Sequence, residues 1–152
     1  MTVPAPASPK QPSYLVATDG STEAEAAVDY AITLAKRTGA SLQVLSVGML
    51  SKGAAVIGPN TERLAASSPG LKDAKSAVEA AVRRAKAAGV PAKPQTAQAP
   101  DPAPAIVQRA EEMGATMIIM GSRGMTGIKR VLLGSVAERV VELAHCPVLV
   151  VR

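Results

Sequence analysis

The chain of 152 residues has no phenylalanine, no tryptophan and only two tyrosines, Tyr14 and Tyr30. Proteins that bind single-stranded nucleic acid stack bases on aromatic side chains, so the near absence of aromatics argues against that function. The formal net charge of +5 does not reverse this conclusion, because the basic residues are dispersed at helical spacing among alanines. We therefore expect solvated helix faces and no nucleic-acid partner.

Cysteine and histidine are almost absent as well, since each occurs once, in the adjacent pair His145-Cys146. A single cysteine excludes an intrachain disulfide and agrees with a reducing, cytoplasmic location. One histidine and one cysteine are too few ligands for a closed zinc site, so no protein-bound metal is expected. Because Cys146 begins an apolar run, packing is its expected role.

Long apolar runs are also missing. None approaches the roughly 20 residues that a membrane-spanning helix needs, so no membrane partner is expected. Residues 1–12 contain four prolines and no apolar stretch typical of a secretory signal. We interpret them as a disordered N-terminal arm that precedes one domain, residues 13–152. With 47% apolar residues, this length suffices for one buried core.

Short apolar runs alternate with amphipathic stretches throughout that domain. Strands are predicted at residues 14–18, 41–47, 92–99, 116–120 and 146–151. Helical spacing of alanine and valine predicts a helix between each pair of consecutive strands. Pro91 and Pro94 place the third strand at a sheet edge, because proline cannot donate to a ladder. Residues 48–70, rich in glycine and proline, are expected to form a long loop of unassigned role.

Capping signals mark where three of the helices begin. Thr22 and Ser135 are each followed three residues later by a glutamate, the spacing of a capping box. Asp101 precedes Pro102, which predicts an N-cap followed by proline at the first helical position. The alternation of strands and helices favours a doubly wound, Rossmann-like parallel sheet with helices on both faces.

Ligands of such sheets bind beyond the carboxyl ends of the strands, where the strand order reverses. Two loops follow strand ends in this chain, one at Asp19 and one that begins at Gly121. If the first and fourth strands are neighbours, both loops line one crevice. Asp19 is suited to accept hydrogen bonds from ribose hydroxyls, and Val47 and Met120 offer apolar surface to a base.

The second loop has the composition of a phosphate site. Its glycines permit close backbone approach, and successive N–H groups in such a turn can bind an anion. Gly134 and Ser135 lie at the start of the last predicted helix, where free N–H groups and the helix dipole favour phosphate. Arg123 adds positive charge. Turn residues, a cap and a solvated arginine remain the structural alternatives for Asp19, Ser135 and Arg123.

The segment Gly121–Ser135, GSRGMTGIKRVLLGS, resembles the G-x2-G-x9-G-S/T nucleotide motif of the universal stress protein family. The stretches YLVATDGS, GATMIIMGSRG and CPVLVVR are also similar to that family, and the resemblance covers residues 13–152. It implies five strands in the order 3-2-1-4-5, ATP, ADP or AMP in the crevice, and a role in the stress response. Magnesium would bind through the phosphates, since Mg²⁺ keeps several waters and few protein ligands.

The resemblance also assigns residues by position. It implies that Asp19 meets the ribose and Val47 the adenine, that Met120 and Gly121 border the pocket, and that four residues hold phosphates, namely Gly124, Gly134, Ser135 and Val136. Ala17 stands where many relatives carry proline, which removes no ligand. The strand order leaves residues 147–151 at a sheet edge. An apolar edge favours pairing with a second copy, and the resemblance implies a homodimer too.

Other nucleotide-binding classes lack their motifs here. The chain has no GxxxxGK[ST] and no GxGxxG after its first strand, which argues against P-loop and dinucleotide-binding proteins. Three alternatives stay open: a nucleotide-binding sensor with an unidentified protein partner, a slow ATPase, and a dimeric module with an empty pocket. Apart from Asp19 and Glu138, the motif has no nearby group to activate water, which favours binding over hydrolysis.

Overall fold

The computed structural model describes residues 11–49, 69–122 and 133–152. Five strands form one sheet in the order β3-β2-β1-β4-β5, and all four pairings are parallel. This confirms the predicted fold class and strand order. The strands are β1 (Ser13–Ala17), β2 (Ser41–Met49), β3 (Ala92–Ala99), β4 (Met117–Gly121) and β5 (Val148–Val151).

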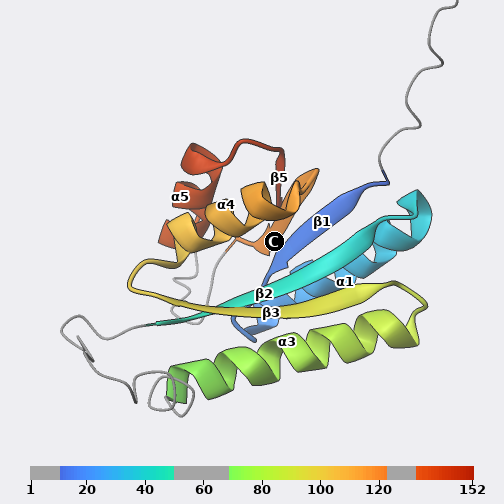
Figure 1. Ribbon diagram of the computed structural model, residues 1–152, viewed down its shortest axis with the longest axis horizontal. Coiled ribbons are helices and arrows are strands. Elements are labelled where there is room, and N and C mark those ends of the chain that lie inside the picture. Colours follow the sequence, from blue (N-terminus) through green and yellow to red (C-terminus); the bar gives the residue numbers. More distant parts are fainter. Residues whose placement is uncertain (1–10, 50–68, 123–132) are drawn as a thin grey trace, which may run out of the picture.

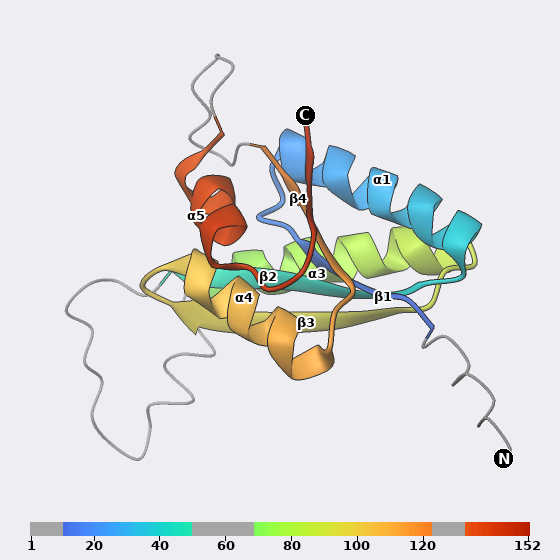
Figure 2. The same ribbon diagram turned by 90° about the horizontal axis from the view of Figure 1, so that it is seen from above.

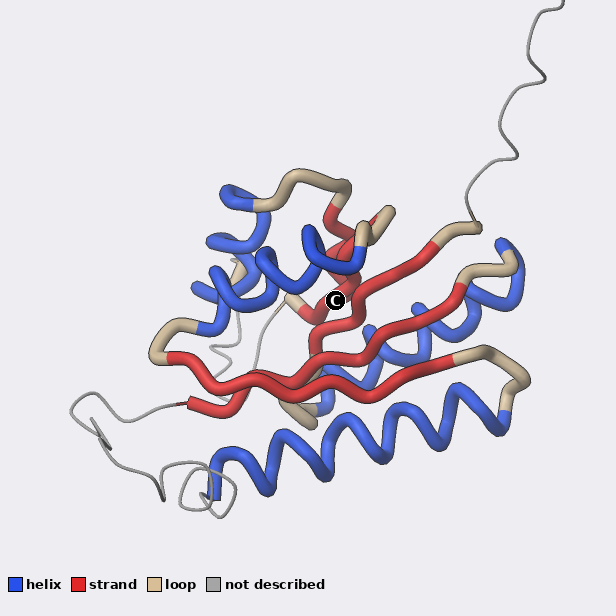
Figure 3. Tube along the Cα trace, in the orientation of Figure 1, coloured by secondary structure: helices blue, strands red, loops and turns tan. Residues whose placement is uncertain are grey.

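Helices cover both faces of the sheet (Figures 1 and 3). They are α1 (Thr22–Thr38), α3 (Pro69–Ala87), α4 (Pro102–Met113) and α5 (Ser135–Leu143). Helices α1 and α3 lie on one face, and α4 and α5 lie on the other (Figures 1 and 2). In the described ranges, no helix is long and apolar enough to cross a membrane.

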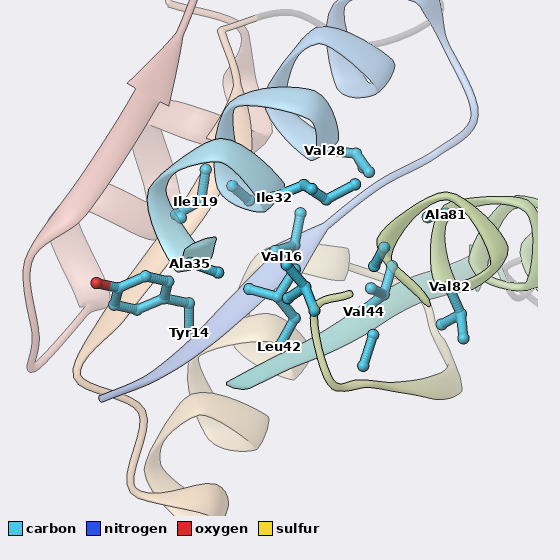
Figure 4. Close-up of a cluster of buried hydrophobic side chains, with 14 of the residues drawn as sticks. Tyr14, Val16, Val28, Ile32, Ala35, Leu42, Val44, Ala81, Val82 and Ile119 are labelled. Carbon is cyan, nitrogen blue, oxygen red and sulfur yellow. The ribbon is translucent and has the colours of Figure 1, made fainter. Parts of the chain in front are cut away.

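Each face of the sheet has its own apolar core. Alternate strand residues point to opposite faces, so neighbours along β1 belong to different cores. Figure 4 shows the α1/α3 core, whose sheet residues include Tyr14, Val16, Leu42, Val44 and Ile119. The α4/α5 core takes Leu15, Ala17, Leu45, Ile118 and Met120 from the sheet and Ala103, Ile106, Val107, Ala110, Ala137 and Val140 from the helices.

The boundaries of the predicted long loop require correction. Residues 48 and 49 belong to β2, and residues 69 and 70 belong to α3, so only 50–68 of the predicted 48–70 fall outside these elements and outside the described residues. Gly48 pairs with Gln98 of β3, and this ladder contact overrides the weak strand preference of glycine. Pro69 suits the first position of a helix, where its missing N–H is not needed.

Two of the three predicted caps were placed one residue too late. Ser21, not Thr22, is the N-cap of α1, and its hydroxyl accepts a hydrogen bond from the Ala24 N–H at 3.3 Å. Gly134, not Ser135, is the N-cap of α5. The third is confirmed: Asp101 caps α4, with Pro102 at its first position. The edge position of β3 is confirmed by the strand order.

Candidate functional site

The strand order reverses between β1 and β4, which pair directly, with Ala17 beside Met120. The first and fourth strands are therefore neighbours, which is the condition for the loops after them to line one crevice. Their carboxyl ends lie side by side. Ala17, Met120 and the half-buried Val47 all face the α4/α5 core. These three residues thus lie on one face of the sheet, on three adjacent strands and near their carboxyl ends.

The β1–α1 connection forms a tight turn that uses Asp19 within the chain. Its Oδ1 accepts a hydrogen bond from the Ser21 N–H at 2.9 Å, and the Gly20 N–H donates to the Thr18 hydroxyl at 3.1 Å. Gly20 has a φ of +80°, a conformation that favours glycine. The structural role considered for Asp19 is therefore real. Its side chain is exposed, so this role does not bury it away from a ligand.

Gly121 ends β4 and lies against the first turn of α1. A Cβ atom at this position would come within 2.9 Å of the Glu23 carbonyl oxygen and 3.2 Å of the Ala24 nitrogen. Real Cβ atoms essentially never show the first of these distances, and the second is tighter than most real contacts. Glycine is thus required here for helix–strand packing, which the sequence did not indicate. The close fit places the end of β4 directly against the first turn of α1.

Gly134 and Ser135 lie at the same carboxyl end of the sheet, because Gly134 is hydrogen-bonded to Ser122. The Gly134 N–H donates to the Ser122 carbonyl at 2.7 Å, and the Ser122 N–H donates to the Val151 carbonyl at 2.8 Å. This fixes the start of α5 beside the end of β4. Gly134 has no side chain, and no side-chain hydrogen bond caps this helix among the described residues. Ser135 is exposed, and Val136 packs against the α4/α5 core.

The structure thus brings most of the predicted site residues to the carboxyl end of the sheet, where β1, β2 and β4 end and α5 begins. Arg123 and Gly124 lie outside the described residues. Sequence reasoning missed Ser122, which is buried, and the packing role of Gly121. Ser122 bonds Gly134 and Val151 through its backbone C=O and N–H, so its residue type gave no signal of this role.

A small cavity lies at the amino-terminal end of the sheet, near the beginning of β4 and β5. It has a volume of about 100 Å³ and is lined in part by Glu111, His145 and Cys146. This is well below the roughly 300 Å³ at which ligand pockets usually begin. His145 pairs with Glu111 at 2.6 Å, and burial raises the pKa of Cys146 although a backbone hydrogen bond from Ile118 opposes the shift. The raised pKa disfavours a reactive thiolate at Cys146.

These features define a doubly wound α/β protein with its topological switch point between β1 and β4, the position at which proteins of this architecture bind ligands. A model of the universal stress protein family matches residues 14–152. Universal stress protein YxiE of Bacillus subtilis strain 168 is 38% identical over 148 residues, covering 91% of this chain and 97% of YxiE. The chain therefore belongs to the universal stress protein family.

Two solved structures extend this likeness. MJ0577, a universal stress protein of Methanocaldococcus jannaschii, superposes with a TM-score of 0.77 and 29% identity, covering 93% of this chain and 95% of that chain. A universal stress protein solved in complex with cAMP superposes with a TM-score of 0.65 and 26% identity, covering 93% of this chain and 97% of that chain.

Proposed function

We propose that this universal stress protein binds an adenine nucleotide, most favourably ATP, at the β1/β4 switch point and acts as a cytoplasmic stress-response sensor. The observation that carries the proposal is the start of α5. Its N-cap is Gly134, held at the end of β4 and given no side-chain cap by the described residues. The N–H groups of this first turn suit a phosphate acceptor. The relative in complex with cAMP supports an adenine nucleotide as the ligand.

The remaining roles follow the geometry of the edge. The adenine would lie against the half-buried Val47, next to the buried strand ends at Met120 and Ala17, and Asp19 would face the ribose from the β1–α1 turn. Gly121 borders the pocket, and Gly134, Ser135 and Val136 hold phosphates. Arg123 and Gly124 complete the phosphate loop in the proposal on the strength of the motif alone.

Magnesium enters the proposal only with the nucleotide. The described residues contain no group of three or more histidine, cysteine, aspartate or glutamate side chains that could hold a metal ion. Mg²⁺ prefers to keep waters and to bind phosphate oxygens in nucleotide sites. It would therefore bridge the phosphates, and ATP affinity should fall when magnesium is chelated.

Mass spectrometry of nucleotide released from the purified, denatured protein tests the proposal, followed by calorimetric titration of the nucleotide-free protein. We expect ATP, ADP or AMP in the released material and saturable binding of ATP. GTP serves as a control ligand of equal charge. If no nucleotide is released and no binding heat is seen up to millimolar ATP, the proposal is wrong. The alternative of a dimeric module with an empty pocket would then be favoured.

The same site is proposed to bind without efficient catalysis. Hydrolysis needs a group that orients or activates water, and Asp19 already bonds its own turn. We expect turnover well below the ~1 s⁻¹ lower end of ordinary enzymes. A magnesium-dependent rate that survives repurification and disappears in Asp19→Ala would show that the protein is an ATPase.

We propose in addition that two copies pair through β5. This strand lies at the sheet edge, and all four of its apolar residues are half-buried in the single chain. Helices α1 and α5 both contact β5, and each exposes a large apolar side chain, Tyr30 at 51% and Val141 at 47%. Apolar edges invite pairing with another chain, and like-with-like pairing gives a closed two-fold contact.

Light scattering at micromolar concentration tests the dimer. Leu149→Lys and Val150→Lys each place a charge on β5 and should shift the protein to monomer, while Thr96→Lys on the opposite edge strand should leave the dimer intact. Circular dichroism checks that the variants are folded, because Leu149 also packs against the α1/α3 core. A monomeric parent protein, or a dimer that survives both β5 substitutions, contradicts the pairing.

A further inference from the structure

An ion pair joins the N-cap of α4 to the middle of α5. Asp101 follows β3 and is the N-cap of α4, where its Oδ1 accepts a hydrogen bond from the Ala103 N–H at 3.2 Å. Its second oxygen, Oδ2, lies 3.3 Å from Nη2 of Arg139 on α5. One carboxylate thus caps one helix and neutralises a cation on the other. Both helices begin at the carboxyl end of the sheet, where the proposed nucleotide site lies.

Arg139 lies four residues after Ser135 on α5. Residues spaced by four are neighbours on a helix surface, with Cβ atoms about 5–6 Å apart. Helical side chains also tilt toward the N-terminus of their helix. The side chain of Arg139 is therefore directed toward the first turn of α5, and a charge acts over roughly 8 Å at physiological salt.

The ion pair between Asp101 and Arg139 can open at little cost in stability. The side chains of Arg139 and Asp101 are 52% and 43% exposed, and exposed ion pairs contribute little to stability. Asp101 keeps its role as a cap without Arg139, because that role uses Oδ1. A guanidinium also binds phosphate with two parallel hydrogen bonds, and phosphate carries more charge than one carboxylate.

We propose that the Asp101–Arg139 pair sets the preference of the site for nucleotides with more phosphates. In the absence of nucleotide, Asp101 holds and neutralises Arg139. When ATP binds, Arg139 turns to the terminal phosphates, and Asp101 remains as the cap of α4. Arg139 thus favours ATP over AMP, and Asp101 limits this preference by competing for the same guanidinium. The inference rests on the proposed nucleotide site.

The test is a calorimetric series of AMP, ADP and ATP with four proteins: the parent, Arg139→Gln, Asp101→Asn and Arg109→Gln. Arg109→Gln is the matched control, because it removes an equal charge from a partly exposed i,i+3 pair with Glu112 within α4. Arg139→Gln should weaken ATP binding about tenfold and AMP binding less than about twofold, since a charged hydrogen bond of this kind corresponds to such a factor. Asp101→Asn should strengthen ATP binding a few-fold, because asparagine also caps a helix while carrying no charge.

The outcomes separate the two proposals. Failure of the parent to bind any of the three nucleotides overturns the proposed function, and this inference with it. Binding by the parent, with an ATP-to-AMP affinity ratio that is the same in Arg139→Gln and Arg109→Gln, overturns the inference alone. A merely structural pair between α4 and α5 would change the melting temperature and leave that ratio untouched. A reduced salt dependence of ATP binding in Arg139→Gln alone supports the proposal.

Discussion

Helices α1 and α5 follow neighbouring strands of the sheet and begin at the same edge, yet their first turns are completed differently. At α1, the Ser21 hydroxyl accepts the Ala24 N–H, and Glu23 and Glu25 place negative charge in the first turn. At α5, the N-cap is Gly134, and the described residues supply no side-chain cap. Helix α5 also carries an acidic residue, Glu138, in its first turn, so the difference between the two helices lies in the cap. A helix that supplies its own acceptor needs no anion there, whereas the first turn of α5 is suited to receive one.

We therefore expect the start of α1 to serve stability and the start of α5 to serve ligand binding. The start of α1 is closed by its own chain and packed tightly against Gly121, so changes there should affect folding. The start of α5 is anchored through a backbone hydrogen bond from Gly134 to Ser122, so changes in its side chains should affect ligand binding. Substitutions at the two helix starts can therefore break or sharpen this comparison.

The largest effect is expected from Gly134→Val. Gly134 has φ −63° and ψ 157°, an extended conformation that valine readily adopts, so the fold should survive. The added side chain would block phosphate from the N–H groups, and ATP affinity should fall on the order of a hundredfold, as expected for two lost charge-assisted hydrogen bonds of about 1.5 kcal/mol each. Calorimetry measures the affinity, and Gly134→Ala should give an intermediate loss. Unchanged ATP binding by a folded Gly134→Val protein would place the phosphates elsewhere.

Gly121→Ala should act on stability. The new Cβ would meet the backbone of Glu23 and Ala24, which cannot move as a side-chain tip can. Overpacking of this kind costs about 1–3 kcal/mol, and urea denaturation measures it as a lower free energy of unfolding. Gly114→Ala is a control in open space whose cost comes from its φ of +65° alone. If Gly121→Ala is no less stable than the parent, the tight packing of β4 on α1 is wrong.

Ser135→Ala should act on affinity. The hydroxyl does not cap α5, so its removal should change the free energy of unfolding by less than about 0.5 kcal/mol. Loss of a hydrogen bond to phosphate should weaken ATP binding about tenfold. Calorimetry and urea denaturation of the same preparation separate the two effects. A large loss of stability with unchanged affinity would restore Ser135 to the capping role that its spacing to Glu138 first suggested.

Ser21→Ala is the mirror substitution, and its effect is the smallest. Removing the N-cap hydroxyl of α1 should lower the free energy of unfolding by about 1 kcal/mol. ATP affinity should change less than about twofold, because the phosphates are proposed to bind the first turn of α5, to which neither Ser21 nor Ala24 belongs. Thermal denaturation with and without ATP checks both statements. Equal losses of affinity in Ser21→Ala and Ser135→Ala would remove the distinction between the two helix starts.

Strong local signals made the fold predictable from sequence. Pro94 indicated an edge strand and Asp101-Pro102 a helix start, and both were right. The predicted N-cap positions of α1 and α5 were wrong by one residue, because serine, threonine and glycine at adjacent positions are all acceptable N-caps. Packing between distant segments left no local signal. The approach of Gly121 to Glu23, and the anchoring of Gly134 by Ser122, depend on strands brought together only by the fold.

The central claim is that phosphate binds the first turn of α5 and leaves that of α1 alone. Amide chemical shifts of isotope-labelled protein, recorded by NMR with ATP and separately with adenosine, test it most directly. The difference between the two spectra isolates the effect of the phosphates. The account predicts the largest differences at the amides of Ser135, Val136 and Ala137 and small ones at Ala24. Differences centred on Glu23 and Ala24, or none at the start of α5, would contradict it.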